Sequence, residues 1–213
     1  MKIATFHFSL FGVNSYIVYD PVERKAALID TGIIDDDEWN AIDVFLTRNK
    51  LSLTHIINTH LHIDHALANH RASQKYNAPV FAHAADKPLL MRMQEQADMF
   101  GLPFHVETAS IDNWLTDGMV IHIGQGSLKV IHVPGHSPGG LALYDADGGF
   151  LISGDSLFAG SIGRTDLPGG DLDQLLSSIK EKLLSLPDDT VVYPGHGEAT
   201  TIMRERRMNP FLR

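Results

Sequence analysis

The chain contains no cysteine, so disulfides and thiolate metal ligands are excluded. It also lacks an apolar run of about 20 residues, the length that crosses a bilayer. The first eight residues alternate like a β-strand and do not resemble the apolar core of a signal peptide. The net charge of -9 favours neither nucleic-acid phosphates nor anionic membranes. We therefore expect a cytoplasmic protein without a nucleic-acid or membrane partner, and no pattern specifies its oligomeric state.

Linkers, low-complexity segments and short-period repeats are missing as well. A chain of 213 residues with 44% hydrophobic content can bury one sizeable core without disulfides or partners. The sequence therefore predicts a single domain over residues 1–213.

Alternating and helical patterns divide the chain into two roughly similar halves, each with strands followed by a helix. Strands are predicted near residues 2–8, 14–19 and 25–30, before a helix from about Glu38 to Asn49. A second helix is predicted from Asp171 to Leu186, because leucines recur there at intervals of three and four residues and Pro187 follows. A site formed by both halves should lie where they meet.

The segment from Asp86 to Phe100 is rich in leucine and methionine. Its pattern favours a helix that buries a methionine-rich face. The functional alternative is a mobile lid that contacts substrate.

The segment His60-Leu61-His62-Ile63-Asp64-His65 contains four possible metal ligands in six residues. An apolar, β-branched stretch at 53–58 predicts a buried strand before it, and residues 66–72 predict a helix after it. A rigid strand end would thus hold the ligands in place. The non-functional alternative is a histidine-rich surface turn that chelates metal adventitiously.

The same arrangement recurs three times further along the chain. Strand-like segments run into Gly135-His136, Gly154-Asp155 and Gly195-His196. Glycine allows positive φ and close backbone approach, which a crowded metal centre needs. The candidate ligands are therefore His60, His62, Asp64, His65, His136, Asp155 and His196.

Seven such ligands exceed the four to six that one zinc-like ion takes, so two divalent ions are predicted, with a carboxylate bridging them. The other histidines lack the strand-and-glycine context and are expected to be structural. They are His7, His55, His70, His83, His105, His122 and His132.

These motifs, in this order and with Ile29-Asp30-Thr31-Gly32 near the start, resemble the metallo-β-lactamase superfamily of metallohydrolases. The resemblance is strongest to the compact bacterial glyoxalase II branch, through Ser161-Ile162-Gly163-Arg164-Thr165-Asp166 and the segment 205–212. It implies an α/β fold, specifically a four-layer αββα sandwich.

The resemblance also completes the division of ligands between the two ions. The first ion would take His60, His62 and His136, the second would take Asp64, His65 and His196, and Asp155 would bridge both. Zinc is the first expectation, and all-nitrogen-and-oxygen ligands also accept iron or manganese.

Two such ions can lower the pKa of a shared water toward about 7, so that it attacks a carbonyl at neutral pH. Asp64 could orient that nucleophile. Asp30 could orient the ligands from behind, or it could serve only as a turn residue.

The function that the resemblance implies is hydrolysis of S-(2-hydroxyacyl)glutathione thioesters such as S-lactoylglutathione, a step of methylglyoxal detoxification. Arg164 stands where the family holds glutathione with a basic residue, although it could simply pair with Asp166. An accompanying tyrosine is missing, and only seventeen residues follow His196, too few for the helical glutathione-binding domain of the larger enzymes.

Other activities remain open at this point. The motifs also fit a mononuclear iron persulfide dioxygenase, a lactonase, or a metal-binding protein without catalysis. Gly135-His136-Ser137-Pro138-Gly139 matches the G-x-S-x-G nucleophile elbow of serine hydrolases. That elbow requires a helix after the serine, whereas residues 139–144 predict a strand.

Overall fold

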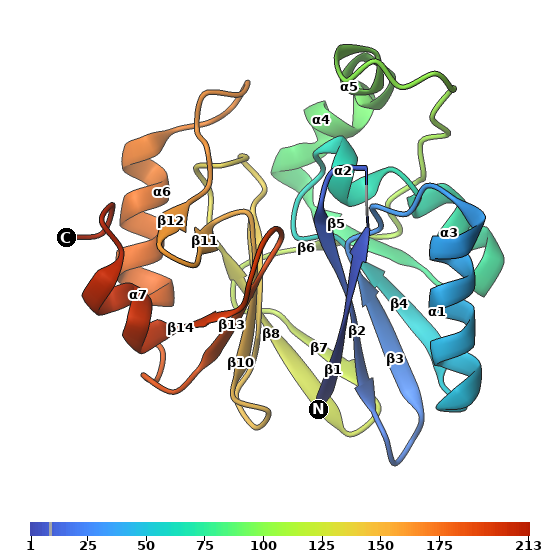
Figure 1. Ribbon diagram of the computed structural model, residues 1–213, viewed down its shortest axis with the longest axis horizontal. Helices are drawn as coiled ribbons and strands as arrows, with labels where there is room; N and C mark the ends of the chain where they lie inside the picture. Colours follow the sequence, from blue (N-terminus) through green and yellow to red (C-terminus); the bar gives the residue numbers. More distant parts are fainter. Residues whose placement is uncertain (9) are drawn as a thin grey trace.

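Two six-stranded sheets pack face to face in the computed structural model, which describes residues 1–8 and 10–213 (Figure 1). The first sheet has the order β1 (Lys2–Phe8), β2 (Val13–Asp20), β3 (Lys25–Ile29), β4 (Ser52–Ile57), β5 (Val80–His83), β6 (Asn113–Leu115). The second has the order β14 (Thr200–Thr201), β13 (Val191–Pro194), β10 (Phe150–Gly154), β9 (Leu141–Asp145), β8 (Gly126–His132), β7 (Val120–Ile123). A small hairpin joins β11 (Leu157–Phe158) to β12 (Ser161–Ile162).

The inner faces of the two sheets form the central core. Ile29 and Ile57 of the first sheet belong to one buried cluster with Val130, Leu143 and Ile152 of the second, and all five are fully buried. Alternating side chains from two aligned sheets interdigitate in this way in β-sandwiches.

Helices cover the outer faces of both sheets (Figure 1). On the first sheet lie α1 (Asp36–Arg48) and α3 (Asn69–Tyr76), whose Trp39 and Ala72 pack in a second buried cluster. On the second sheet lie α6 (Leu172–Ser178), the π-helical turn η2 (Ile179–Leu183) and α7 (Ile202–Met208), whose Ile179 and Ile202 belong to a third. The predicted four-layer αββα sandwich is therefore confirmed.

The two predicted long helices differ in their details. The first begins two residues earlier than expected, because the Asp35 side chain accepts a hydrogen bond from the Glu38 amide and caps it. The second is capped by Asp171, whose side chain accepts a hydrogen bond from the Gln174 amide, but it continues as the π-helical turn rather than as one regular helix. Its first leucine, Leu172, is 48% exposed instead of buried.

The remaining helical segments lie at the end of the sandwich where several strand ends meet (Figure 1). They are α2 (Ile63–Ala66), the 3-10 turn η1 (Ala84–Asp86), α4 (Lys87–Met91) and α5 (Met93–Met99). No helix within residues 1–8 and 10–213 is long and apolar enough to cross a membrane.

Backbone hydrogen bonds join the two halves at this same end. The Asn14 amide donates to the Gly195 carbonyl over 2.7 Å, and the Leu141 amide donates to the Thr59 carbonyl over 2.7 Å. These bonds tie the start of β2 to the loop after β13, and the start of β9 to the loop after β4, so the two halves meet at this end, as the repetition in the sequence predicts.

Candidate metal centre

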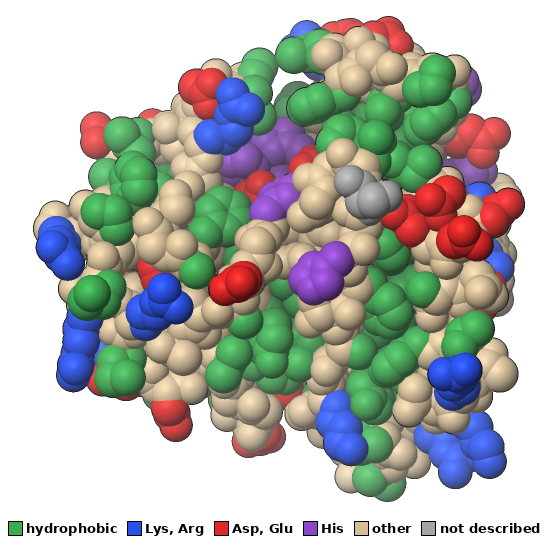
Figure 2. Space-filling model, viewed as in Figure 1, with side chains coloured by type: hydrophobic (Ala, Val, Ile, Leu, Met, Phe, Trp, Pro, Cys, Tyr) green, Lys and Arg blue, Asp and Glu red, His purple; other side chains and the backbone are tan. Residues whose placement is uncertain are grey.

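Four loops at the junction of the halves bring the seven predicted ligand side chains together. His60 and His62 follow β4, Asp64 and His65 lie in α2, His136 follows β8, Asp155 follows β10, and His196 follows β13. Figure 2 shows histidine side chains at the bottom of a hollow at this end of the molecule. None of the other seven histidines belongs to a group able to hold a metal within the described part of the chain.

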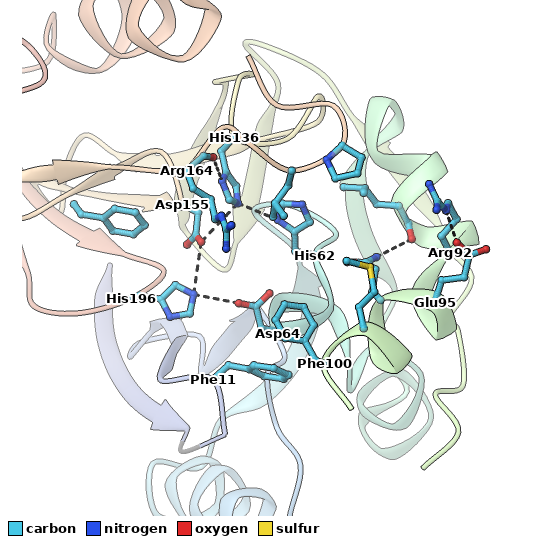
Figure 3. A pocket seen from close by; sticks show the side chains of 16 residues that line it. Phe11, His62, Asp64, Arg92, Glu95, Phe100, His136, Asp155, Arg164 and His196 are labelled. Atoms are coloured by element: carbon cyan, nitrogen blue, oxygen red, sulfur yellow. Dashed lines mark hydrogen bonds and ion pairs between the residues drawn. The ribbon is translucent and has the colours of Figure 1, made fainter. Parts of the chain in front are cut away.

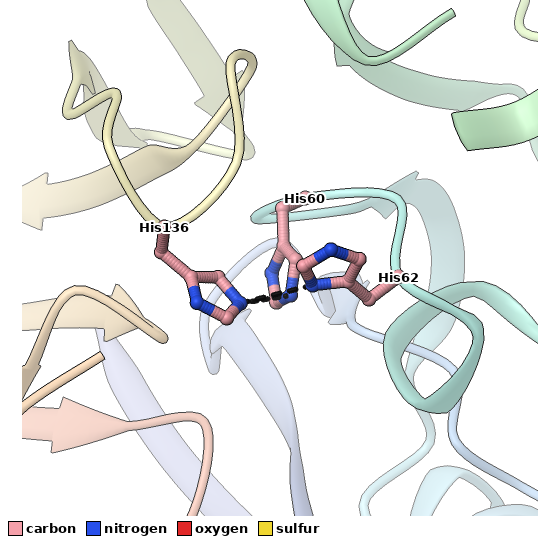
Figure 4. A group of neighbouring side chains, drawn as sticks. All are labelled: His60, His62 and His136. Atoms are coloured by element: carbon pink, nitrogen blue, oxygen red, sulfur yellow. Dashed lines mark hydrogen bonds between the residues drawn. The ribbon is translucent and has the colours of Figure 1, made fainter. Parts of the chain in front are cut away.

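The first donor group consists of three buried imidazoles, His60, His62 and His136 (Figure 4). The His136 Nε2 atom lies 3.2 Å from His60 Nε2 and 2.9 Å from His62 Nδ1. Ring nitrogens this close either share a proton or direct their lone pairs at a common cation.

The second donor group consists of Asp64, His65 and His196. Asp64 Oδ2 lies 3.2 Å from His196 Nε2 and 3.6 Å from His65 Nε2. The ligand atoms of Asp64 and His65 also lie within 4.8 Å of that of His60, so the structure brings the two predicted ligand sets together, and their division between two ions stays a prediction.

Asp155 lies between the two groups. Its Oδ2 atom is 3.7 Å from His136 Nε2 and 3.6 Å from His196 Nε2, while its Oδ1 atom is 3.4 Å from His65 Nε2. A carboxylate that faces both groups in this way has the arrangement that a bridging ligand needs.

Hydrogen bonds on the far side of the rings fix which nitrogen faces inward. The Nδ1–H groups of His65, His136 and His196 are directed at Asp30 Oδ2 (2.8 Å), the Arg164 carbonyl (2.8 Å) and the Gly12 carbonyl (3.1 Å), respectively. His60 Nδ1 likewise contacts Thr59 Oγ1 at 3.1 Å. Since these acceptors take the Nδ1 protons, the Nε2 lone pairs point into the cluster.

Two buried atoms of the cluster, His65 Nε2 and Asp155 Oδ1, have no hydrogen-bond partner. Buried polar atoms without a partner are rare in folded proteins, and an ion is one of the groups that satisfies them. The residues therefore fit a bound cation.

Burial also sets the charges of the donors. It lowers the pKa of His62 to about 4, helped by the neighbouring His136, and it lowers the pKa of His60 well below its usual value. Burial alone would raise the pKa of Asp155, but His65 and His196 beside it hold that pKa below the ordinary value. At His65 and His196 burial is outweighed by the carboxylates of Asp64 and Asp155, which raise the pKa values of these two imidazoles. A divalent metal binds neutral imidazoles and ionised carboxylates, so its binding would displace protons from these two rings.

Asp30 lies directly behind the second group and is fully buried. Besides His65, its carboxylate accepts hydrogen bonds from the Thr59 amide and hydroxyl, both at 2.7 Å. Its backbone has φ of 57°, a left-handed conformation that is uncommon for residues other than glycine. The contacts agree with the predicted role in orienting ligands, which stays a prediction.

We expect Asp30→Asn to lower metal affinity about 10- to 100-fold, the usual cost of removing a carboxylate that orients a histidine ligand. The amide would no longer hold the Nδ1 proton of His65 as a charged acceptor does. Metal titration followed by calorimetry measures the change, with exposed Asp36→Asn as control. Unchanged affinity would leave Asp30 with only its structural role.

Asp86 is a buried residue that the sequence analysis did not single out as part of the site. Its carboxylate accepts hydrogen bonds from the Leu61 amide (3.0 Å), the Ser137 hydroxyl (3.0 Å) and the Gly139 amide (2.5 Å). Leu61 stands between His60 and His62, and Ser137 follows His136. One carboxylate therefore ties together the two loops that form the first donor group.

The position of Ser137 does not suit a nucleophile. Its side chain is fully buried, and its hydroxyl donates a hydrogen bond to Asp86. The chain after it forms a turn and then β9, with no helix. The second glycine of the motif, Gly139, is explained by packing, because a Cβ at this position would lie 2.6 Å from Asp86 Cγ. The serine-hydrolase interpretation is therefore wrong.

A pocket of about 500 Å³ opens above the donor groups (Figure 3). Arg164 lines it, with a side chain 60% exposed, and its guanidinium makes two 2.7 Å hydrogen bonds to Asp166. The two interpretations of Arg164 are thus compatible, because the ion pair forms at the edge of the pocket.

The segment from Asp86 to Phe100 forms two short helices rather than one, and it does not bury a methionine-rich face. Met93 is buried, whereas Met91 and Met99 are 78% and 75% exposed. Met99 and Leu89 line the pocket, so this segment forms one of its walls.

An αββα sandwich with histidine and aspartate donors between its halves defines a metal-binding hydrolase class. The chain belongs to the metallo-beta-lactamase superfamily, whose family model matches residues 9–196. This membership, and the resemblance to the glyoxalase II-like branch, confirm the relationship predicted from the motifs.

Similar proteins match over nearly the whole chain. Hydroxyacylglutathione hydrolase GloC of Haemophilus influenzae is 35% identical, with 100% of this chain and 98% of the relative covered. Probable metallo-hydrolase YqgX of Bacillus subtilis is 37% identical, with 93% and 92% covered. The solved structure of TTHA1623 in a di-iron-bound form has a TM-score of 0.85 at 37% identity, covering 98% of this chain and 100% of that one.

Proposed function

We propose that this protein hydrolyses S-(2-hydroxyacyl)glutathione thioesters, such as S-lactoylglutathione, with two divalent metal ions. The observation that carries the proposal is Asp155, whose carboxylate faces both donor groups at the floor of a substrate-sized pocket. The name of the Haemophilus influenzae relative supports the thioester substrate.

In this proposal His60, His62 and His136 hold one ion, Asp64, His65 and His196 hold the other, and Asp155 contacts both. When bound, the ions supply Lewis-acid polarisation of the carbonyl and lower the pKa of water. Zinc, iron and manganese all suit these donors, and the di-iron form of the solved relative supports a pair of ions.

Asp64 has a further role in the proposal. Its Oδ2 atom faces His65 and His196, and its side chain is 20% exposed in the pocket, so Oδ1 can accept a hydrogen bond from the attacking water. A carboxylate in this position orients the water toward the thioester carbonyl.

The thiolate leaving group of a thioester needs no proton donor in the pocket. A thiolate departs without a proton from a general acid, because thiols have pKa values near 8.5. Glu95 lines the pocket but is already paired with Arg92 at 2.6 Å. Arg164 keeps guanidinium N–H groups for a carboxylate of the glutathione moiety, while it stays paired with Asp166.

Thiol release from S-lactoylglutathione tests the proposal against its alternatives. We expect release that disappears on chelation and returns when metal is added, with Ser137→Ala retaining most of the rate. Oxygen consumption with glutathione persulfide, together with no thiol release from S-lactoylglutathione, would instead establish the dioxygenase. Hydrolysis of a lactone in place of thioesters would establish the lactonase.

A further inference from the structure

The pocket above the donor groups is walled largely by apolar side chains. They come from the β1–β2 turn, from α4 and α5, and from the segments that follow β10 and β12. They are Phe11, Leu89, Met99, Phe100, Phe158, Leu167 and Pro168.

The polar side chains of the wall already have hydrogen-bond or ion-pair partners. Gln96 accepts a hydrogen bond from the Ile63 amide (3.1 Å) and donates one to the Leu89 carbonyl (2.9 Å). Arg92 is paired with Glu95, and Arg164 with Asp166. Apart from the guanidinium N–H groups that Arg164 keeps, this wall therefore offers apolar surface rather than free hydrogen-bond partners to a bound acyl group.

The pocket is polarised along the line that joins the two donor groups. Arg164 lies beside the first group, because its carbonyl accepts a hydrogen bond from His136. Phe11 lies beside the second donor group, because the carbonyl of the next residue, Gly12, accepts a hydrogen bond from His196. Figure 3 shows Phe11 and Phe100 on the Asp64 side of the cluster, with Arg164 on the His136 side.

The apolar end is open to water in the free protein. Phe100 is 57% exposed and Met99 is 75% exposed, and the Phe100 ring packs edge-to-face on Phe11 with centroids 5.4 Å apart. A ligand chain laid on these rings would remove apolar surface from water, which is favourable. A hydroxyl or charged group placed there would lose hydrogen bonds to water without replacement.

We infer that, among thioesters, this pocket prefers an apolar acyl chain longer than lactoyl, which lies against Phe11 and Phe100, while the polar thiol moiety extends toward Arg164. The inference rests on the proposed thioester hydrolysis. It adds a preference among acyl groups and leaves the proposed hydrolysis, including that of S-lactoylglutathione, unchanged.

A series of glutathione thioesters of increasing acyl length tests it. Each methylene that enters the pocket should raise kcat/KM about fourfold, the ratio that ~0.8 kcal/mol per buried methylene gives. Butyryl should therefore exceed acetyl about 15-fold, and butyryl should also exceed lactoyl. Values that are flat, that fall with length, or that favour lactoyl would overturn the inference and leave thioester hydrolysis standing.

Phe100→Ala should flatten the series by slowing the hexanoyl ester while changing the acetyl ester little. Phe211→Ala is the matched control, because Phe211 is 51% exposed and does not line the pocket. An unchanged slope in Phe100→Ala would place the chain elsewhere and overturn the assignment.

Binding of S-alkylglutathione thioethers, which are not hydrolysed, gives a readout independent of turnover. Calorimetry should show S-hexylglutathione binding more tightly than S-methylglutathione in the wild type, with a smaller difference in Phe100→Ala. Equal affinities for the two thioethers would count against the apolar subsite. Failure of every thioester to react, with this difference in binding retained, would instead refute the proposed function.

Discussion

The Asp155→Ala variant is expected to lose about a thousandfold in kcat/KM, equivalent to about 4 kcal/mol of transition-state stabilisation. Asp155 contributes the carboxylate that faces His65, His136 and His196. Without it the second group keeps only Asp64 as a carboxylate donor, and no carboxylate connects the groups. We therefore also expect fewer bound ions per chain, measured by elemental analysis beside the thioester assay.

The control for this variant is Asp147→Ala in the exposed β9–β10 turn, which should keep wild-type activity and metal content. Asp155→Asn separates charge from shape, because the amide fills the same space and keeps one oxygen. Full activity in Asp155→Ala, with two ions still bound, would contradict the bridging role.

The Asp86→Ala variant is expected to lower the free energy of unfolding by about 3 kcal/mol or more. Three buried donors, on Leu61, Ser137 and Gly139, would lose their acceptor, and each unsatisfied donor costs about 1–3 kcal/mol. Because two of these bonds fix the loops that present His60, His62 and His136, metal affinity should also fall about 10- to 100-fold. Denaturation of metal-free protein and metal titration measure the two effects separately.

Asp86→Asn provides the graded comparison. It keeps the volume and one acceptor oxygen but turns an NH₂ group toward a donor, so both effects should be smaller than in the alanine variant. Exposed Asp98→Ala, on the neighbouring α5, should change neither quantity. Normal stability in Asp86→Ala would mean that water replaces the carboxylate, and the loops would then be held by other contacts.

The sequence was sufficient to predict that the candidate donors lie together, because each stands in the segment that follows a strand. His136, Asp155 and His196 follow strands of one sheet, and strand ends of neighbouring elements meet at the same edge. The αββα layers could likewise be predicted from the motifs through the family resemblance. These predictions depend on local patterns, which a sequence displays directly.

The residues that were missed act through partners far away in the chain. Asp86 bonds to Ser137, 51 residues later, and two of its three donors are backbone amides, which carry no side-chain signal. Its position shortly after β5, at a strand end like the others, was the available clue. The methionines of α5 were misjudged because Met99 faces an open pocket, and periodicity does not distinguish a pocket wall from a core.

Each donor group draws on both halves of the sandwich, since His136 joins His60 and His62, and His196 joins His65. An ion can therefore contact all of its donors only when the two sheets are packed together. Its binding free energy then stabilises the packing of the two sheets. By mass action, a cation at 100 times its dissociation constant would add about 2.7 kcal/mol to the folded state. Metal supply would then govern the lifetime of the folded enzyme as well as its turnover, and starvation for the ion would expose the chain to proteolysis.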